Sequence, residues 1–427
     1  MKNAFDKSRE IFLVAFSQGL GVIGSLLLIK ITTKSLNPEE YGIFILWMTI
    51  GLIFNQIITG GPTVSFFRYF SIAEEKKQQN IFFNAALTLS FGAIKLIILI
   101  TIIGSLVLYI FSVKEWITIL LLVNLYACLT FINSSINAVF NAARNRKKVA
   151  VNQSIEWISR VLITSILLKI DSSITFLLLG YLSSTLLASI YNLNEIKNLF
   201  VKTSELTKKD IEEWIKTLKQ FSKPFAIWGI FTALYQMSDK WALQYFASTA
   251  DVGYYGVLYQ LGYTPLTLLT SIMVTYLAPL IFKKHSISNN GHNKNIALTI
   301  AWKAAFLMIA LALFMTILTY LFYPVIYRLL VSGEFFSSSF LLPWVLLAGG
   351  LFAAGQIISL NILSNLSPGL MLKPKVMLSI IGIIINIIAA KYYGLTGVIF
   401  AINIYSLIYL FWMSYLAYTI QKINKLE

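Results

Sequence analysis

The sequence predicts an all-α integral membrane protein with about twelve transmembrane helices, arranged as two pseudo-symmetric six-helix bundles around a central cavity. Two observations lead to this fold class. Hydrophobic residues make up 57% of the 427 residues and charged residues only 12%, against about 25% charged residues in soluble domains. The apolar residues also form long blocks, such as 11–28, 43–58 and 81–111, which approach or exceed the roughly 20 residues that a helix needs to cross a bilayer.

Polar segments between these blocks divide the chain into its expected helices. Strands of a membrane β-barrel would alternate in hydropathy over about ten residues, whereas these blocks are apolar on all sides. The first block is longer than a signal-peptide core and no small-residue cleavage site follows it, so we expect it to be retained. The expected helices lie near residues 10–33, 41–63, 79–111, 116–141, 149–169, 172–193, 222–247, 253–282, 296–323, 338–365, 372–390 and 394–420.

The distribution of Lys and Arg among the loops predicts the orientation of the helices. Most basic residues fall on the two termini and on every second loop, whereas the opposite loops carry only Lys30, Lys34, Lys114, Lys169, Arg328 and Lys391. Basic residues concentrate on the cytoplasmic side of a bacterial membrane, so both termini of this multi-pass chain are expected in the cytoplasm. The net charge of +16 has the same cause, and nucleic acid is not an expected partner.

The longest expected loop, 194–221, separates an N-terminal six-helix bundle (1–193) from a C-terminal six-helix bundle (222–427). Apolar residues recur in this loop at helical spacing, opposite a row of lysines. These apolar residues are Ile211, Trp214, Ile215, Leu218 and Phe221. The pattern predicts a cytoplasmic amphipathic linker helix that lies on the inner membrane surface. A solvated linker without such a helix is the alternative.

A faint internal repeat relates the two halves. The first helix leads into a segment that ends in Tyr41-Gly42, and the seventh leads into a segment that ends in Tyr255-Gly256. Because each half holds an even number of helices, both halves share one orientation, and their symmetry axis is expected along the membrane normal.

Ionisable residues inside the expected helices are the main indication of function, because each costs at least ~2.5 kcal/mol at the centre of a bilayer. These residues are Lys95, Glu156, Arg160, Asp239 and Lys240. Glu156 and Arg160 stand four residues apart and therefore share one face of their helix. Amide side chains add further polar faces, among them Asn133, Asn137, Gln236 and Gln356.

Two interpretations of these residues remain open. In the functional one, the cations and amides line a hydrated cavity and bind substrate, because a planar guanidinium can hold phosphate oxygens in pairs. The substrate-binding candidates are Arg160, Lys240, Lys95, Asn133, Asn137, Gln236 and Gln356, and the ion-coupling candidates are Glu156 and Asp239. In the structural one, the acids neutralise neighbouring cations and join helices, while Lys95 extends to the membrane surface from an otherwise apolar helix.

The sequence contains none of the patterns typical of enzymes, metal sites or cofactor sites. Its single cysteine, Cys128, cannot form an internal disulfide. His285 and His292 have no Cys or acidic partners at metal-ligand spacing, and no glycine-rich phosphate loop is present. We therefore expect no catalytic residues, no metal, no cofactor and no hydrolysis of ATP.

Several segments together resemble the Wzx-type flippases of O-antigen and capsule repeat units, within the superfamily of multidrug, oligosaccharidyl-lipid and polysaccharide exporters. The likeness covers essentially the whole chain. The segments that carry it are Leu36-Asn-Pro-Glu-Glu-Tyr-Gly42, Arg68-Tyr-Phe, Asn141-Ala-Ala-Arg144-Asn-Arg146, Arg160 after Glu156, Ser238-Asp239-Lys240-Trp, Val252-Gly253-Tyr-Tyr255-Gly256, Tyr259-Gln260 and Pro265.

The resemblance implies that the chain moves an undecaprenyl-diphosphate-linked oligosaccharide from the cytoplasmic to the periplasmic leaflet of the inner membrane by alternating access. It also implies a role in lipopolysaccharide biosynthesis, beside a polymerase and a chain-length regulator of the same pathway. Lipid II flippases of this group carry arginines in the first helix, whereas residues 17–21 are neutral here, so transport of peptidoglycan precursors is not expected.

Three other classes of protein remain as alternatives. One is a multidrug or other small-molecule exporter of the same superfamily, and another is an unrelated sugar or drug facilitator. The third is a membrane glycan polymerase or ligase, which would need a sizeable periplasmic loop with catalytic basic residues. The longest candidate loop, 324–337, holds only Arg328 and Glu334 as charged residues, so an enzyme is not expected.

Overall fold

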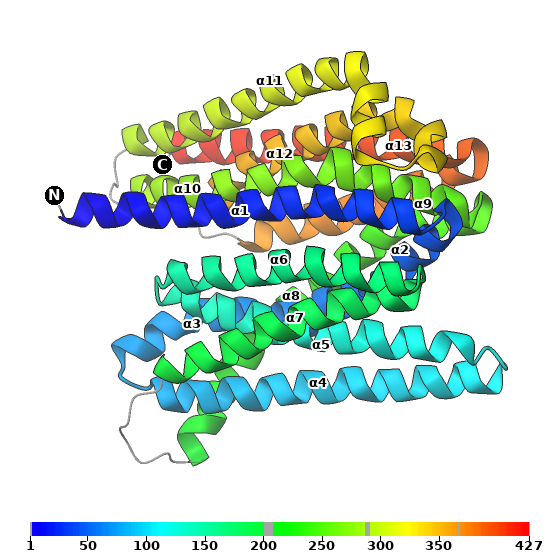
Figure 1. Cartoon of the computed structure of the whole chain (residues 1–427). Helices are drawn as coiled ribbons and strands as arrows, with labels where there is room; N and C mark the ends of the chain where they lie inside the picture. Colours follow the sequence, from blue (N-terminus) through cyan, green and yellow to red (C-terminus); the bar gives the residue numbers. More distant parts are fainter. Residues whose placement is uncertain (1, 200–207, 287–290, 365–367, 427) are drawn as a thin grey trace. The chain divides into compact units, whose positions relative to one another are not determined.

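The computed structural model describes residues 2–199, 208–286, 291–364 and 368–426, and the regular elements in these ranges are helices (Figure 1). They form two compact units. The N-terminal unit comprises Met1–Leu36 and Ile43–Ala233, and the C-terminal unit comprises Asn37–Gly42 and Leu234–Glu427. The predicted all-α fold class is therefore confirmed over the described ranges.

The N-terminal unit contains most of the helices of the first half of the chain. Within it, α6 packs against both α1 and α7, and α5 packs against α3, α4 and α7. Because α2, η1 and α3 follow one another without a break, they form one long helix with a π-helical turn in its middle. The elements are α1 (Lys2–Ser35), α2 (Pro38–Ile53), the π-turn η1 (Phe54–Thr59), α3 (Gly60–Glu75), α4 (Gln79–Ile110), α5 (Glu115–Ala142), α6 (Arg146–Ile170), α7 (Ile174–Ile196) and the short 3-10 helix η2 (Lys197–Leu199).

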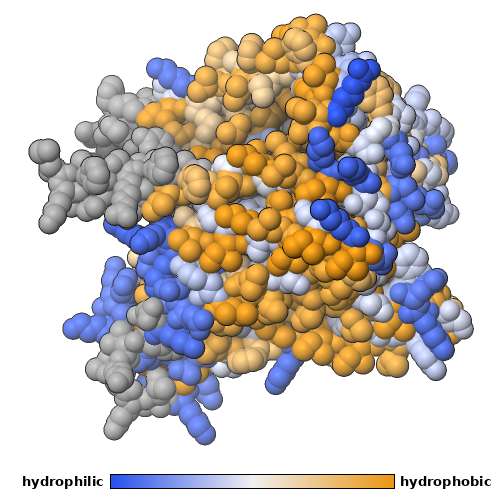
Figure 2. Space-filling model, in the orientation of Figure 1, coloured by the Kyte–Doolittle hydropathy of each residue, from blue (hydrophilic) through white to orange (hydrophobic). Residues whose placement is uncertain are grey.

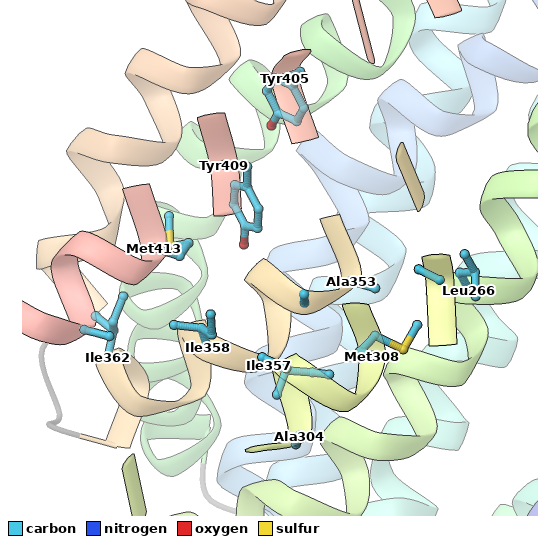
Figure 3. Packing of buried hydrophobic residues seen from close by; sticks show 14 of the residues in the cluster. Leu266, Ala304, Met308, Ala353, Ile357, Ile358, Ile362, Tyr405, Tyr409 and Met413 are labelled. Atoms are coloured by element: carbon cyan, nitrogen blue, oxygen red, sulfur yellow. The ribbon is translucent and has the colours of Figure 1, made fainter. Parts of the chain in front are cut away.

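The C-terminal unit is built around α12, which packs against α10, α11 and α13. Its core joins Ile357 and Ala353 of α12 to Met308 of α11 and to Tyr405 and Tyr409 of α13 (Figure 3). The elements are the last part of α8 (Lys208–Phe246), whose residues up to Ala233 belong to the N-terminal unit, α9 (Thr249–Leu258), the π-turn η3 (Tyr259–Tyr263), α10 (Thr264–Ser286), α11 (Gly291–Leu330), the 3-10 helix η4 (Gly333–Leu341), α12 (Leu342–Ser364) and α13 (Pro368–Leu426).

α13 consists of two helices that meet at Gly394. At 59 residues it would be about 88 Å long if straight, almost three times the ~30 Å thickness of bilayer hydrocarbon. The backbone of Gly394 has φ 53° and ψ −138°, a conformation that glycine adopts at low cost because it has no Cβ. The break falls where the sequence predicts the end of one membrane helix and the start of the next.

The described chain holds nine candidate membrane spans that are long and apolar enough to cross a bilayer. Apolar side chains cover most of the face drawn in Figure 2, and hydrophilic residues gather toward the ends of the helices. These nine spans do not include α6 or α8, and they count α13 as one span although it consists of two helices. When α6 and α8 are added and α13 is counted as two, the described ranges contain the twelve helices that the sequence predicts. The chain is therefore a multi-pass helical membrane protein.

The predicted linker helix is the first part of α8. Trp214 and Leu218 are buried in a core with Phe66, Phe70 and Phe82, and the Trp214 indole N–H donates to Gln78 Oε1 at 3.1 Å. The apolar stripe thus packs against α3 and α4, because aromatic side chains of the chain itself provide a matching apolar surface. The boundary between the compact units lies inside α8, after Ala233, and so differs from the predicted boundaries at 193 and 222.

The predicted repeat appears in the way α2 and α9 begin. Asn37 Oδ1 accepts a hydrogen bond from the Glu40 N–H (2.9 Å), and Ser248 Oγ accepts one from the Asp251 N–H (3.0 Å). These capping pairs satisfy backbone donors that the first helical turn leaves open. Each of these helices also continues into a π-turn, η1 or η3.

Contacts between the starts of α2 and α9 show which residues of these two helices correspond to each other. A Cβ on Gly42 would overlap the Thr249 carbonyl oxygen, and a Cβ on Gly253 would overlap the Pro38 carbonyl oxygen. The two helix starts therefore contact each other reciprocally, as elements related by a local two-fold axis do. The structural counterpart of Gly42 is thus Gly253, and the predicted match with Gly256 lies one helical turn too late.

Candidate functional site

The N-terminal unit contains a buried ion pair on α6. Arg160 and Glu156 stand one turn apart, and the Arg160 guanidinium donates to Glu156 Oε1. The residue Arg160 is only 6% exposed. An unpaired cation at this depth would lose most of its hydration, so the carboxylate offsets part of the cost of burial. This is the ion pair that the structural interpretation of the sequence expects.

Polar and aromatic groups from neighbouring helices surround the Arg160 guanidinium. Its Nε donates to Ser184 Oγ at 3.3 Å, and its terminal nitrogen donates to Thr185 Oγ1 at 3.0 Å, both on α7. The guanidinium carbon lies 4.8 Å from the ring centroid of Tyr181 and 5.9 Å from that of Tyr126. Ring faces attract a cation at such distances. The result is a rigid cationic site enclosed by α5, α6 and α7.

Trp157 links this site to α1. Its ring centroid lies 5.2 Å from the guanidinium carbon of Arg160. On its other side, a Cβ added at Gly21 or Gly24 would come within 3.0 Å of the indole. The neutral, glycine-containing part of the first helix therefore gives the indole room to lie close to α1.

The C-terminal unit contains the second buried charge pair, on α8. Lys240 Nζ lies 3.0 Å from Asp239 Oδ1 and also donates to the Gln236 carbonyl oxygen at 3.0 Å. Asp239 Oδ2 accepts a hydrogen bond of 2.6 Å from the Tyr255 hydroxyl. The Lys240 ammonium lies 5.3 Å from the ring centroid of Tyr255 and 5.2 Å from that of Tyr259. Both units thus hold a cation beside aromatic rings and beside a carboxylate of its own helix.

An amide network joins α5, α6 and α7 near the Arg160 site. Asn192 Nδ2 donates to Asn133 Oδ1 at 3.1 Å, and Asn137 Nδ2 donates to Asn152 Oδ1 at 3.0 Å. Asn133 Nδ2 in turn donates to the Thr185 carbonyl oxygen at 3.2 Å. Asn133 is 4% exposed. Its amide therefore joins helices in this structure, as the structural interpretation of the sequence expects.

Of the remaining predicted site residues, Gln236 contacts Lys240 through its backbone, whereas Lys95 and Gln356 make no described contact with either charge pair. Lys95 is exposed on α4, among exposed apolar side chains, and makes no hydrogen bond or ion pair with any residue that the structure describes. The side chains of Gln236 and Gln356 are half-buried, and the contacts described for both involve their backbone carbonyl groups. Within the N-terminal unit the structure thus brings together the Glu156–Arg160 pair and the asparagines, but not Lys95.

Sequence reasoning missed the groups that surround the two cations. Tyr126 and Tyr181 lie on helices other than α6, and aromatic residues make up 14% of the chain, so nothing in the pattern distinguishes these two. Thr185 and Ser184 are likewise ordinary polar residues of an apolar helix. Within the described ranges, no group of three or more His, Cys, Asp or Glu residues could hold a metal ion. Each of the two sites pairs a partly dehydrated cation with a carboxylate of the same helix.

The described helices define a multi-pass membrane protein, and two of these helices carry paired charges. The model of one protein family, described as polysaccharide biosynthesis protein, matches residues 8–285. The chain belongs to this family. The predicted family resemblance is thereby confirmed at the level of the polysaccharide biosynthesis family.

Solved structures share the fold at low sequence identity. The lipid II flippase MurJ, in an inward closed conformation, is 17% identical, with a TM-score of 0.71 over 95% of this chain and 86% of that one. An inward-facing multidrug resistance MATE family transporter of the MOP superfamily is 13% identical, with a TM-score of 0.66 over 96% and 95%. A MOP superfamily transporter from Pyrococcus furiosus is 15% identical, with a TM-score of 0.60 over 98% and 95%. No curated protein matches the chain.

Proposed function

We propose that this chain is a flippase of the Wzx type. It moves an undecaprenyl-diphosphate-linked oligosaccharide repeat unit from the cytoplasmic to the periplasmic leaflet by alternating access. The observation that carries the proposal is the presence of two cations inside helices of a polysaccharide biosynthesis protein, the buried Arg160 and the partly buried Lys240. Ionisable residues at bilayer depth are costly and mark substrate or ion pathways.

The chemistry of such a substrate fits these cations. A diphosphate with its hydroxylated sugars would lose its hydration in hydrocarbon at a prohibitive cost, whereas a polyprenyl tail can stay in the lipid. A guanidinium binds phosphate oxygens with strong, charge-assisted hydrogen bonds. We assign to Arg160 and Lys240 the role of binding the diphosphate during its passage.

The neutral first helix supports a repeat unit as cargo, as opposed to lipid II. Residues 17–21 carry no charge, and a Cβ added at Gly21 would already lie 3.0 Å from the Trp157 indole. The distribution of Lys and Arg supports cytoplasmic termini and the bacterial inner membrane. A polymerase and a chain-length regulator of the same pathway are the protein partners that this role implies.

A multidrug exporter is the second candidate, because the fold is shared with a MATE family transporter. The family match favours a saccharide cargo, because the matching family is described as polysaccharide biosynthesis protein. The two functions also predict different phenotypes when the gene is deleted.

Deletion of the gene tests the proposal. We expect loss of surface glycan and accumulation of lipid-linked repeat units in the cytoplasmic leaflet. A plasmid with the wild-type gene or with Ser159→Ala restores the glycan, because the Ser159 hydroxyl bonds only to the backbone of its own helix. Arg160→Gln does not restore it. Normal surface glycan in the deletion strain, with sensitivity to several unrelated drugs, would favour the exporter instead.

A further inference from the structure

The Glu156 carboxylate lies where an anionic ligand of Arg160 would bind. We infer that Glu156 is an internal counter-anion that competes with the phosphate of the substrate for the Arg160 guanidinium. This inference rests on the proposed function and assigns the residue that controls binding and release at this site.

The contacts of Glu156 are those that a phosphate oxygen would make. Glu156 Oε1 accepts hydrogen bonds from the Arg160 guanidinium and, at 3.2 Å, from Thr185 Oγ1. Arg160 also donates to Thr185 Oγ1 at 3.0 Å, so the three groups close a small ring. Phosphate and carboxylate oxygens accept the same charge-assisted hydrogen bonds from a guanidinium. A phosphate oxygen can therefore take the place of Oε1 without any change in the donors.

Burial determines which of the two partners can move. The Glu156 side chain is 22% exposed, whereas that of Arg160 is 8% exposed. Arg160 is also held by Ser184 and by the rings of Tyr181 and Trp157. The carboxylate is thus the outer partner, and an anion reaches the fixed guanidinium only when Glu156 rotates away.

The second pair, Asp239 and Lys240, does not have a carboxylate that can rotate away from its cation. The Asp239 side chain is 7% exposed, and its oxygens accept from the Tyr255 hydroxyl (2.6 Å), the Lys240 ammonium (3.0 Å) and the Lys240 backbone N–H (2.7 Å). A short carboxylate with three donors is fixed in place. Of the two ion-coupling candidates, the geometry points to Glu156 as the exchangeable group and to Asp239 as a permanent counter-charge.

Exchange would keep the Arg160 site neutral at every stage. With the substrate bound, the phosphate compensates the guanidinium, and after release Glu156 does so again. A buried cation left without a partner is strongly unfavourable, so a carrier that lacks Glu156 would hold its cargo more tightly and return empty less easily. The internal carboxylate lowers affinity and thereby speeds release.

Binding of undecaprenyl diphosphate to the purified full-length protein in nanodiscs tests the inference. We expect Glu156→Gln to tighten binding about tenfold or more, because the variant removes a competing charged hydrogen bond. Glu156→Asp keeps the charge on a shorter side chain and is expected to tighten binding by a smaller factor. Ser159→Ala is the matched control on the same helix and leaves binding unchanged.

Binding of undecaprenol, which has the tail without the phosphates, distinguishes a failure of the exchange from a failure of the proposed function. Its binding is expected to be the same in all variants. If the wild type prefers the diphosphate but Glu156→Gln binds it no more tightly, the exchange is refuted and the proposed function stands. Should Glu156→Gln not fold, as judged by its melting temperature, unchanged binding by Glu156→Asp refutes the exchange in the same way. A wild type that binds both lipids equally well overturns the proposed function itself.

Discussion

Arg160 and Lys240 are each compensated by a carboxylate within one turn of the same helix. Such a pair enters the membrane as a nearly neutral unit, so one helix carries both the functional charge and the charge that makes its burial tolerable. The aromatic rings beside both cations add attraction without adding charge.

The pairing of Asp239 with Lys240 predicts an effect on the stability of the protein. Asp239→Asn leaves Lys240 without its counter-charge, and we expect the free energy of unfolding to fall by roughly 3 to 5 kcal/mol. The double variant Asp239→Asn with Lys240→Met removes both charges and should recover most of this loss while glycan export stays absent. Thermal unfolding of the purified proteins in detergent measures the first effect, and surface glycan the second. A double variant less stable than Asp239→Asn alone would contradict the assigned pairing.

At this scale the sequence predicts contacts along one helix but not contacts between helices. The spacing of Glu156 and Arg160 is enough to predict their ion pair. Thr185 and Tyr126 come from α7 and α5, and only the packing of these helices brings them to the guanidinium. Asn133 shows the same limit, because a polar residue on an apolar helix can face either water or another amide.

Among the elements, the first part of α8 illustrates how one pattern fits two environments. Helical spacing of Trp214 and Leu218 predicts an amphipathic helix, and the structure has that helix. The same apolar stripe would suit a lipid surface or a protein surface, since both are apolar. The stripe packs against α3 and α4 because Phe82 and Tyr69 meet the Trp214 ring edge-to-face, at 5.7 and 6.3 Å between centroids.

Replacement of Trp214 distinguishes the two surfaces. Trp214→Ala removes a buried ring and its hydrogen bond to Gln78, so we expect a loss of about 3 to 5 kcal/mol in stability. Lys216→Ala, on the exposed side of the same helix, is the control and should change stability by less than ~0.5 kcal/mol. Melting of the detergent-purified protein, where no bilayer surface is present, is the measurement. Equal melting temperatures for both variants would argue for a helix that lies on lipid.

The close contact between the starts of α2 and α9 predicts that larger residues at this contact destabilise the protein. Gly42→Ala and Gly253→Ala each force a methyl group into the backbone of the facing helix, so we expect a loss of about 1 to 3 kcal/mol or a failure to fold. Gly92→Ala is the matched control, since a Cβ there meets no atom within 4 Å. The yield and melting temperature of the purified variants test this. Wild-type behaviour of Gly42→Ala would mean that the two helices do not approach so closely.

For the whole molecule, the helices that carry the charge pairs are also the least apolar ones. Nine candidate spans in the described ranges are recognised by length and hydropathy, and α6 and α8 are not among them. Sequence reasoning still predicted both from their apolar blocks and the polar segments between them, and the alternation of basic loops supports the even number of helices. Hydropathy and loop charge together thus predict the number of helices, whereas the packing within each unit depends on side-chain shapes that the pattern does not contain.

Direct transport in reconstituted vesicles tests the central claim, that a charged carbohydrate head crosses the bilayer through this protein. The purified chain would be reconstituted into liposomes that contain a fluorescent undecaprenyl-diphosphate oligosaccharide in both leaflets, and a membrane-impermeant quencher would then report the outer-leaflet fraction. We predict that wild-type protein exposes almost all of the fluorescent lipid over time, while Arg160→Gln leaves only the outer-leaflet fraction exposed, as in protein-free vesicles. Wild-type vesicles that behave like protein-free ones, or Arg160→Gln vesicles that behave like wild type, would contradict the account.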